Sequence, residues 1–276
     1  MARRNGAAAH RRGIGVVLTA VLYGLLASSG FFVGVLVGLI TAPPRRLVAA
    51  IMAFGGGVLV SALTFDLMEE AEADGSTAYV IAGFLAGALL YVLADVALER
   101  MARVSPKREG RDPGDMKPGA ERIPETSEQA AIGGTALLVG AMLDGIPENA
   151  AIGIGLGSEG TDLGLVLLAA VFLGNVPESL SSAVGMRQEG RSRAYIVGVW
   201  GAVTVGCVLA TVAGYALLGG LSSNMVSAVL ALAAGGILAM LADTMFPEAF
   251  ENGGPWVAMA TALGFAVAFL LSHATG

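Results

Sequence analysis

Two short runs of the chain place a carboxylate, a proline and a small residue together inside segments that are otherwise apolar. They are Asp144-Gly-Ile-Pro-Glu-Asn149 and Gly174-Asn-Val-Pro-Glu-Ser179, and they begin 30 positions apart. A carboxylate in the hydrocarbon of a bilayer costs on the order of 3 kcal/mol or more, so a chain that keeps one there generally uses it. A proline inside a helix removes a backbone donor and frees the carbonyl oxygen four residues before it. Because charge, proline and freed oxygen occur together twice, we predict a cation site at membrane depth.

The spacing within each run brings oxygen ligands to one helix face. Asp144 and Glu148 are four residues apart and therefore share a face, and Asn175 stands three residues before Glu178 on nearly the same face. Carboxylate, amide and freed carbonyl oxygens suit a divalent cation better than an apolar or anionic solute. The predicted metal ligands are Asp144, Glu148, Asn175 and Glu178. The alternative is that each Pro-Glu pair ends or kinks a helix near the membrane surface with its glutamate in water, which the duplication disfavours.

Five further residues are weaker candidates for the pathway of the ion. Glu69 and Glu248 close their apolar runs, which is equally typical of a solvated helix end. Asp66 and Asp243 lie deeper and are predicted to line the route. Cys207 is more often a small buried residue than a metal ligand, and its role as a soft ligand is the lesser alternative.

The composition is that of a polytopic membrane protein. The 276 residues are 55% hydrophobic and 14% charged, with a mean hydropathy of +0.73, whereas a soluble protein carries about a quarter charged residues. The single cysteine excludes an internal disulfide and a multi-cysteine metal cluster, and the two histidines lie near the chain ends. Because no nucleophile is paired with a histidine inside the apolar runs, we expect neither enzyme activity nor an organic cofactor.

Apolar runs of spanning length predict an all-α fold of eight transmembrane helices. These runs cover residues 13–40, 46–68, 77–98, 129–157, 162–186, 193–220, 224–249 and 255–273. The first run follows a basic tail at 1–12 and is too long for a signal peptide, so it is interpreted as a spanning helix. The hydrophilic stretch 100–128, rich in proline, glycine and mixed charge, is predicted to be a flexible cytoplasmic loop within a single membrane domain, 13–276.

The distribution of basic residues predicts the orientation in the membrane. Twelve of the 16 lysines and arginines lie in alternate loops, around residues 45–46, 100–122 and 187–193, which should face the cytoplasm. The other four are the arginines of the tail, which favour the opposite orientation, whereas the loop between the second and third runs is acidic. We expect a multi-pass protein of the cell membrane with both termini, and thus the tail 1–12, outside the cytoplasm.

A weak repeat supports the count of eight. Residues 56–69 resemble residues 235–248 at a constant offset of 179, with a glycine pair and a terminal glutamate aligned in each. The two segments run in opposite directions across the membrane if the chain spans it eight times. We therefore predict three, two and three helices with the outer threes related by inverted symmetry, an architecture found in transporters.

These residues resemble the ZIP family of divalent-metal transporters, in its bacterial branch. The helix-4 pattern of that family is His-Asn-x-Pro-Glu-Gly, and its helix-5 pattern ends in Pro-Glu-Gly or Pro-His-Glu. Glu148 and Glu178 match the bridging glutamates of the family, and Asp144 stands where a metal-binding histidine is usual. Asn175 matches an Asn or Asp position. Eight helices, external termini, a cytoplasmic loop after helix 3 and the three-two-three repeat extend the resemblance over nearly the whole chain.

The chain also departs from the family pattern. Gly145 and Gly174 replace family ligands, and Asn149 and Ser179 replace the glycines that follow each glutamate. These departures remove every imidazole from the predicted site. Carboxylate and carbonyl oxygens favour Mn²⁺ and other harder cations, whereas zinc is the usual substrate of the family.

The resemblance implies a transporter that moves zinc, or Mn²⁺ or Fe²⁺, into the cytoplasm by alternating access, with the metal as substrate. Two alternatives from other classes stay open: a proton-coupled antiporter of another cation or solute, and a non-transporting relative that binds metal. The expected partners are metal ions, the lipid bilayer and a second copy of the chain, with no nucleic acid.

Overall fold

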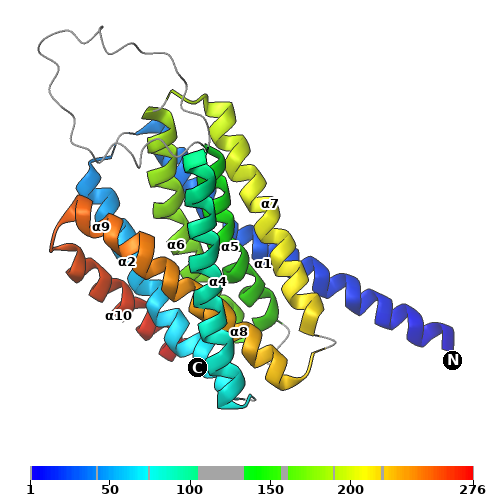
Figure 1. Ribbon diagram of the computed structural model, residues 1–276. Coiled ribbons are helices and arrows are strands. Elements are labelled where there is room, and N and C mark those ends of the chain that lie inside the picture. Colours follow the sequence, from blue (N-terminus) through cyan, green and yellow to red (C-terminus); the bar gives the residue numbers. More distant parts are fainter. Residues whose placement is uncertain are drawn as a thin grey trace, which may run out of the picture.

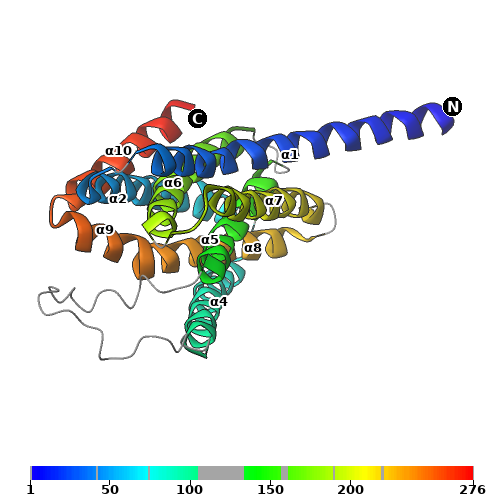
Figure 2. The same ribbon diagram turned by 90° about the horizontal axis from the view of Figure 1, so that it is seen from above.

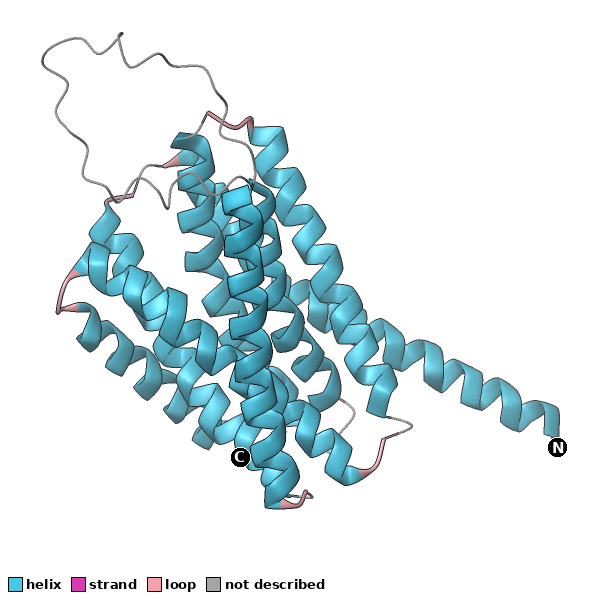
Figure 3. Cartoon of the chain, in the orientation of Figure 1, coloured by secondary structure: helices cyan, strands magenta, loops and turns pink. Residues whose placement is uncertain are grey.

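The structure is a computed structural model that describes residues 2–41, 43–73, 75–104, 134–156, 161–188, 190–218 and 221–275. The side chains at 2–14, 16, 98–99, 101–104, 134–140, 143–144, 161–166, 217–218 and 274–275 are outside the described part. The described residues are helical apart from short connections, and they contain no strand (Figure 3). The predicted all-α class is confirmed.

Two chain segments contain a π-helical interruption. The first half of the chain forms α1 (Ala2–Ile40), α2 (Arg45–Ala62), the π-helical η1 (Leu63–Leu67), α3 (Met68–Ala73) and α4 (Thr77–Val104). The second half forms α5 (Gly134–Gly155), α6 (Thr161–Gln188), α7 (Arg193–Leu218), α8 (Ser223–Met240), the π-helical η4 (Leu241–Met245), α9 (Phe246–Gly253) and α10 (Val257–Thr275). In both cases the chain passes through the π-helical segment without leaving the helix.

Six stretches of the described residues are long and apolar enough to cross a membrane. They are Val17–Ile40, Arg45–Ala73, Thr77–Ala97, Leu167–Gln188, Arg193–Ala216 and Ser223–His273, the last of which includes the turn between α9 and α10. At that turn Gly254 has φ +70 and ψ −164, a backbone conformation that glycine adopts far more readily than other residues. The chain is thus compatible with a multi-pass membrane protein.

Large apolar side chains on the outside of the bundle are also compatible with a lipid environment. Leu85 on α4 and Leu270 on α10 are 61% and 66% exposed. Such residues would be an aggregation hazard in water, but they face a solvent of their own polarity in a bilayer. The core combines large side chains such as Trp200 and Phe31 with many alanines and glycines, and the small residues let the helices approach one another closely.

The helices pack as two groups. The α1 group consists of α1, α5, α6 and α7, in which α1 packs on α6 and α7, and α5 packs on α7. The α2 group consists of α2–η1–α3, α4, α8–η4–α9 and α10, in which α2 packs on α10, and α4 packs on α8. In the view from above, α2, α9 and α10 lie together on the side opposite α7 (Figure 2). The groups meet mainly where α2 contacts α6 and where α5 contacts α8.

Several helix bounds differ from the predicted ones. α1 begins at Ala2, so the helix continues through most of the predicted tail 1–12, and its amino-terminal end projects away from the bundle (Figure 1). α4 runs on to Val104, into the predicted loop 100–128, and the rest of that loop lies outside the described residues. The α2 segment continues past residue 68 as α3, because η1 adds a wider turn without breaking the helix.

Candidate functional site

Both Pro-Glu pairs lie in the middle of a helix. Pro147 is inside α5, which continues to Gly155, and Pro177 is inside α6, which continues to Gln188. The alternative in which each pair ends a helix is therefore wrong. Each proline lacks a backbone N–H, so each leaves one carbonyl without its usual helical donor in the interior of the bundle.

The two glutamates of these motifs are removed from bulk solvent. Glu148 is 3% exposed, and Glu178 is partly buried. Both carboxylates interact electrostatically with the same thiol, that of the fully buried Cys207 on α7. The glutamates are therefore directed into the same part of the α1 group and away from the outer surface of the bundle.

Of the other two predicted ligands, Asn175 and Asp144, the structure describes the side chain of Asn175 only. Asn175 is 1% exposed, and its Nδ2 donates a hydrogen bond of 3.0 Å to the carbonyl oxygen of Ala27 on α1. Because an amide that donates through its nitrogen keeps its oxygen as an acceptor, the atom that would bind a metal is not used in this bond. The backbone of Asp144 belongs to α5, one turn before Glu148, but its side chain lies outside the described residues.

The residues that follow the two glutamates stabilise the motifs. Asn149 donates from Nδ2 to the carbonyl oxygen of Gly145 at 2.8 Å and accepts a 3.3 Å hydrogen bond from Thr211 of α7. Ser179 donates to the carbonyl oxygen of Asn175 at 2.7 Å. Both polar ends of Asn149 are thus occupied by protein groups, as is the hydroxyl of Ser179, so these buried residues hold the helices in place. The sequence pattern did not reveal this role.

A glycine in α5 makes room for the cysteine of α7. A Cβ atom at Gly145 would lie 2.7 Å from Sγ of Cys207, closer than Cβ contacts in real structures. On the other side, the buried hydroxyl of Ser28 makes no hydrogen bond of standard geometry within the described part of the chain and interacts weakly with the same thiol. Cys207 therefore occupies the space that a side chain at position 145 would need.

The four weaker acidic candidates are spread over the α2 group. Asp66 lies in η1 and is buried, whereas Asp243, in the corresponding η4, is exposed. Glu69 is exposed, and so is Glu248, which accepts a 2.7 Å hydrogen bond from Ser181 of α6. Of these four, Glu248 is thereby tied to α6 one helical turn from Glu178.

No group of three or more His, Cys, Asp or Glu side chains with metal-binding geometry occurs among the residues whose side chains are described. Asp144, the third predicted carboxylate, is not among those residues. What the described part provides is a buried glutamate, a second glutamate nearby, and a buried amide whose nitrogen donates to α1. That donor set fits a cation that binds oxygen.

Comparison with models of known protein families and with curated protein sequences finds no match to this chain.

Proposed function

We propose that the protein is a transporter of divalent metal ions, with zinc, Mn²⁺ or Fe²⁺ as substrate, which it moves inward across the cell membrane. The observation that carries the proposal is the pair of glutamates in the middle of two apolar helices, one of them 3% exposed. A protein that keeps carboxylates in such a position needs a counter-charge, and a cation in transit supplies it.

Glu148, Glu178, Asn175 and Asp144 are the proposed ligands. Coulomb attraction to the carboxylates offsets the cost of removing water from the ion. The four proposed ligands bind through oxygen and include no imidazole, which favours Mn²⁺ or Fe²⁺ as substrates in addition to zinc. Zinc is the usual substrate of the family that the motifs resemble. The exposed Glu69, Asp243 and Glu248 are proposed to attract the ion at the ends of the pathway.

We propose eight spans in a three-two-three arrangement. In chain order the eight spans are α1, α2–η1–α3, α4, α5, α6, α7, α8–η4–α9 and α10. The inverted symmetry exchanges the first three spans with the last three, and the fourth with the fifth. It therefore relates the packing of α1 on α6 to that of α7 on α5. Likewise, the pairing of α4 with α8 becomes that of α10 with α2. The π-helical segments η1 and η4 are at matching places in the second and seventh spans. This correspondence of packing supports the inverted symmetry expected from the repeat.

The two helix groups offer a route to alternating access. Glu148, Asn175 and Glu178 all belong to the α1 group, so displacement of that group against the α2 group would carry a bound ion across the membrane. The hydrogen bond from Ser181 to Glu248 joins the two groups at one end of the molecule. We propose that it holds the carrier closed on the cytoplasmic side.

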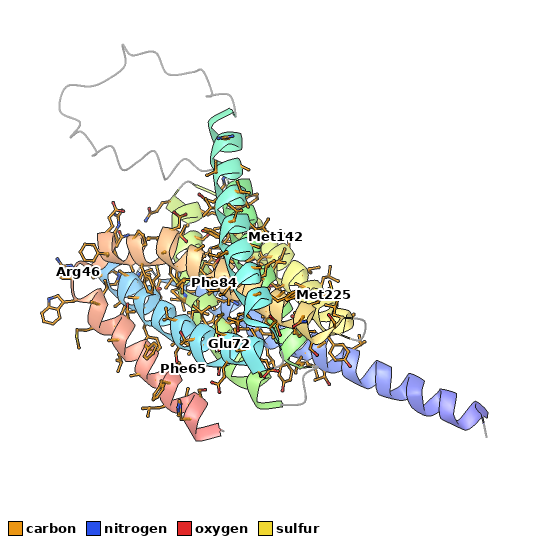
Figure 4. All side chains as sticks on the ribbon, turned by 60° about the horizontal axis from the view of Figure 1, so that its bottom comes forward. Arg46, Phe65, Glu72, Phe84, Met142 and Met225 are labelled. Atoms are coloured by element: carbon orange, nitrogen blue, oxygen red, sulfur yellow. The ribbon has the colours of Figure 1, made fainter. Side chains whose placement is uncertain are left out.

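The proposed orientation places the basic end of the molecule in the cytoplasm. Arg46 and Glu72 lie at opposite ends of the α2–η1–α3 segment (Figure 4). Arg187, at the same end as Arg46, donates hydrogen bonds of 3.3 and 3.2 Å to the carbonyl oxygens of Gly38 and Leu39 at the end of α1. With this end inside, both chain termini lie outside, and metal ions approach the acidic end.

The test is metal uptake by proteoliposomes that contain a divalent-metal indicator. The double variant Glu148→Gln, Glu178→Gln keeps the shape of both side chains but removes their charge, and we expect its uptake to fall to that of empty liposomes. Glu72→Gln, on an exposed position of α3, is the matched control and should retain uptake.

Thermal unfolding in detergent verifies that the double variant is folded. Uptake that persists in the folded double variant contradicts the site. If the wild-type protein instead carries protons or another cation without metal, the antiporter alternative is the correct one. Saturable metal binding without any flux indicates the non-transporting alternative.

A further inference from the structure

A carboxylate of the α2 group is buried with one of its oxygen atoms unpartnered. Asp66 is 7% exposed and lies in the π-helical segment η1. Its Oδ1 accepts a 3.1 Å hydrogen bond from the hydroxyl of Ser272 on α10. Its Oδ2 is buried and has no hydrogen-bond partner among the described residues.

The unpartnered oxygen distinguishes between the two charge states of Asp66. An ionised carboxylate spreads its charge over both oxygens, so a dry Oδ2 leaves a large part of that charge without compensation, at a cost of several kcal/mol. The free-energy cost of burial is smaller for a neutral carboxyl group, because an unsatisfied neutral polar atom costs only about 1–3 kcal/mol. In the neutral form, Oδ1 is the carbonyl oxygen that accepts from Ser272, and Oδ2 carries the proton.

The charged groups around Asp66 do not supply a counter-ion. Glu69, one turn further along the same chain segment, is itself an acid and so cannot neutralise a charge on Asp66. On α10 the neighbouring ionisable residue is His273, whose Nδ1 is 3.0 Å from the carbonyl oxygen of Phe269. The centroid of its ring lies 6.1 Å from that of the Phe65 ring.

The remaining helices packed on η1 also lack a partner for Asp66. α8 contains no ionisable residue at all within Ser223–Met240. On α2 the only charged residues are Arg45 and Arg46, at the far end of the helix. The described ionisable side chains of α6 are Glu178, at the candidate metal site, and Arg187, which binds the end of α1.

The second π-helical segment serves as an internal comparison. η4 also contains an acid, Asp243, at its third position, whereas Asp66 is at the fourth position of η1, and Asp243 is exposed. π-helical turns often occur at functional positions, because the extra residue turns a side chain to a direction that an α-helix would not give. Burial of the acid is therefore particular to η1 and is not a general property of the two segments.

We propose that Asp66 is a proton-binding site, with the proton on Oδ2 and the hydroxyl of Ser272 donating to Oδ1. Asp66 is buried while α10 packs against η1. A rearrangement that brings water to its carboxyl group would stabilise the ionised form, and the proton would then be released. In combination with the proposed function, on which this second step rests, metal movement is coupled to proton movement through a residue of the α2 group, whereas the proposed metal ligands belong to the α1 group.

Infrared spectroscopy of the purified protein tests the protonation directly, without any transport. A protonated carboxyl group gives a carbonyl stretching band above the amide I region. We expect wild-type protein at mildly acidic pH to show such a band, Asp66→Asn to lose it, and the matched control Asp243→Asn to retain it. In Ser272→Ala the band should move to a higher wavenumber, since the hydrogen bond to the carbonyl oxygen is lost.

The variant Ser272→Ala also serves if Asp66→Asn does not fold, because it keeps the acid in place. Spectra in which the band is the same in wild type, Asp66→Asn and Ser272→Ala would overturn the proposal. So would a wild-type band that appears only on removal of sodium ions, since Asp66 would then hold a metal cation.

Proteoliposomes test the coupling. With wild-type protein, we expect a pH gradient to change the rate of metal uptake, whereas with Asp66→Asn the rate of uptake should be the same with and without the gradient. An unaltered response to the gradient in this variant refutes the coupling. If no protein transports metal at all, the proposed function fails, but the infrared result for Asp66 still stands.

Discussion

At the level of single residues, the space beside Pro147 is shared by two side-chain positions on different helices. Gly145 leaves room for the thiol of Cys207, and the buried hydroxyl of Ser28 borders the same space. A sulfur atom from α7 comes close to the place that a side chain at position 145 would occupy. The residue types at positions 145 and 207 are therefore physically coupled, although they are far apart in the sequence.

This coupling predicts a non-additive pair of variants. Gly145→Ala should lower the free energy of unfolding by about 2 kcal/mol, because its Cβ overlaps Sγ of Cys207. In the double variant with Cys207→Ala most of that loss should be recovered. Thermal or denaturant unfolding in detergent measures the cycle, and strictly additive effects would show that the two positions do not share this space.

At the level of helices, close approach of backbones is what assembles both groups. A Cβ at Gly34 of α1 would collide with the carbonyl oxygen of Val176 on α6, and one at Gly153 of α5 with that of Thr211 on α7. The same occurs in the α2 group, at Gly87 of α4 against Leu232 of α8. In an apolar solvent, helices are held by such packing contacts, because lipid tails remove the hydrophobic driving force between them.

Two alanine variants separate packing from helix propensity. Gly87→Ala adds a methyl group that would collide with the backbone of Leu232, and we expect a loss of stability of about 3 kcal/mol. Gly198→Ala in α7 has nothing within 4 Å of the new atom, and we expect a gain of about 0.5 kcal/mol from better helix propensity. Unfolding curves of both variants give the comparison. Equal effects would mean that the close approach of α4 and α8 contributes nothing to stability.

At the level of the whole molecule, the described structure consists of one helix group with the candidate metal site and a second group that packs against it. Contacts between them involve α2 with α6 and α5 with α8. The hydrogen bond from Ser181 to Glu248 is a polar link across this boundary. The link from the backbone N–H of Ser76 to Asn224, 2.9 Å long, lies entirely within the α2 group.

These two links provide a test of relative movement. Cysteines at positions 181 and 248, joined by a short thiol cross-linker, should stop metal uptake, and cleavage of the cross-link should restore it. The same cross-link between positions 76 and 224 should leave uptake unchanged, because it joins helices that move together. The native Cys207 is fully buried and should not react. Continued uptake with the 181–248 cross-link in place would exclude displacement of the groups at that boundary.

Much of the helical organisation follows from the sequence because it depends on local hydrophobicity. Runs of apolar residues predict helices of spanning length wherever they occur, and α6, α7 and α10 begin and end within a few residues of the predicted runs. The mid-helix position of both Pro-Glu pairs follows from the apolar residues on each side of them. The two π-helical segments were not predicted, because an extra residue in a helix leaves no signature in the hydrophobic pattern.

Residue types and spacing were enough to predict the candidate ligands, which are three carboxylates and an asparagine in helices whose apolar faces must be covered or lie in lipid. The use of particular polar groups for packing became visible only in the folded arrangement. The amide nitrogen of Asn175 donates to the carbonyl oxygen of Ala27, and both polar ends of Asn149 bond to neighbouring residues. One carboxylate oxygen of Asp66 is buried without a hydrogen-bond partner among the described residues. Such pairings join residues far apart in the chain, and they depend on the distance between helix backbones, which no local pattern of residues encodes.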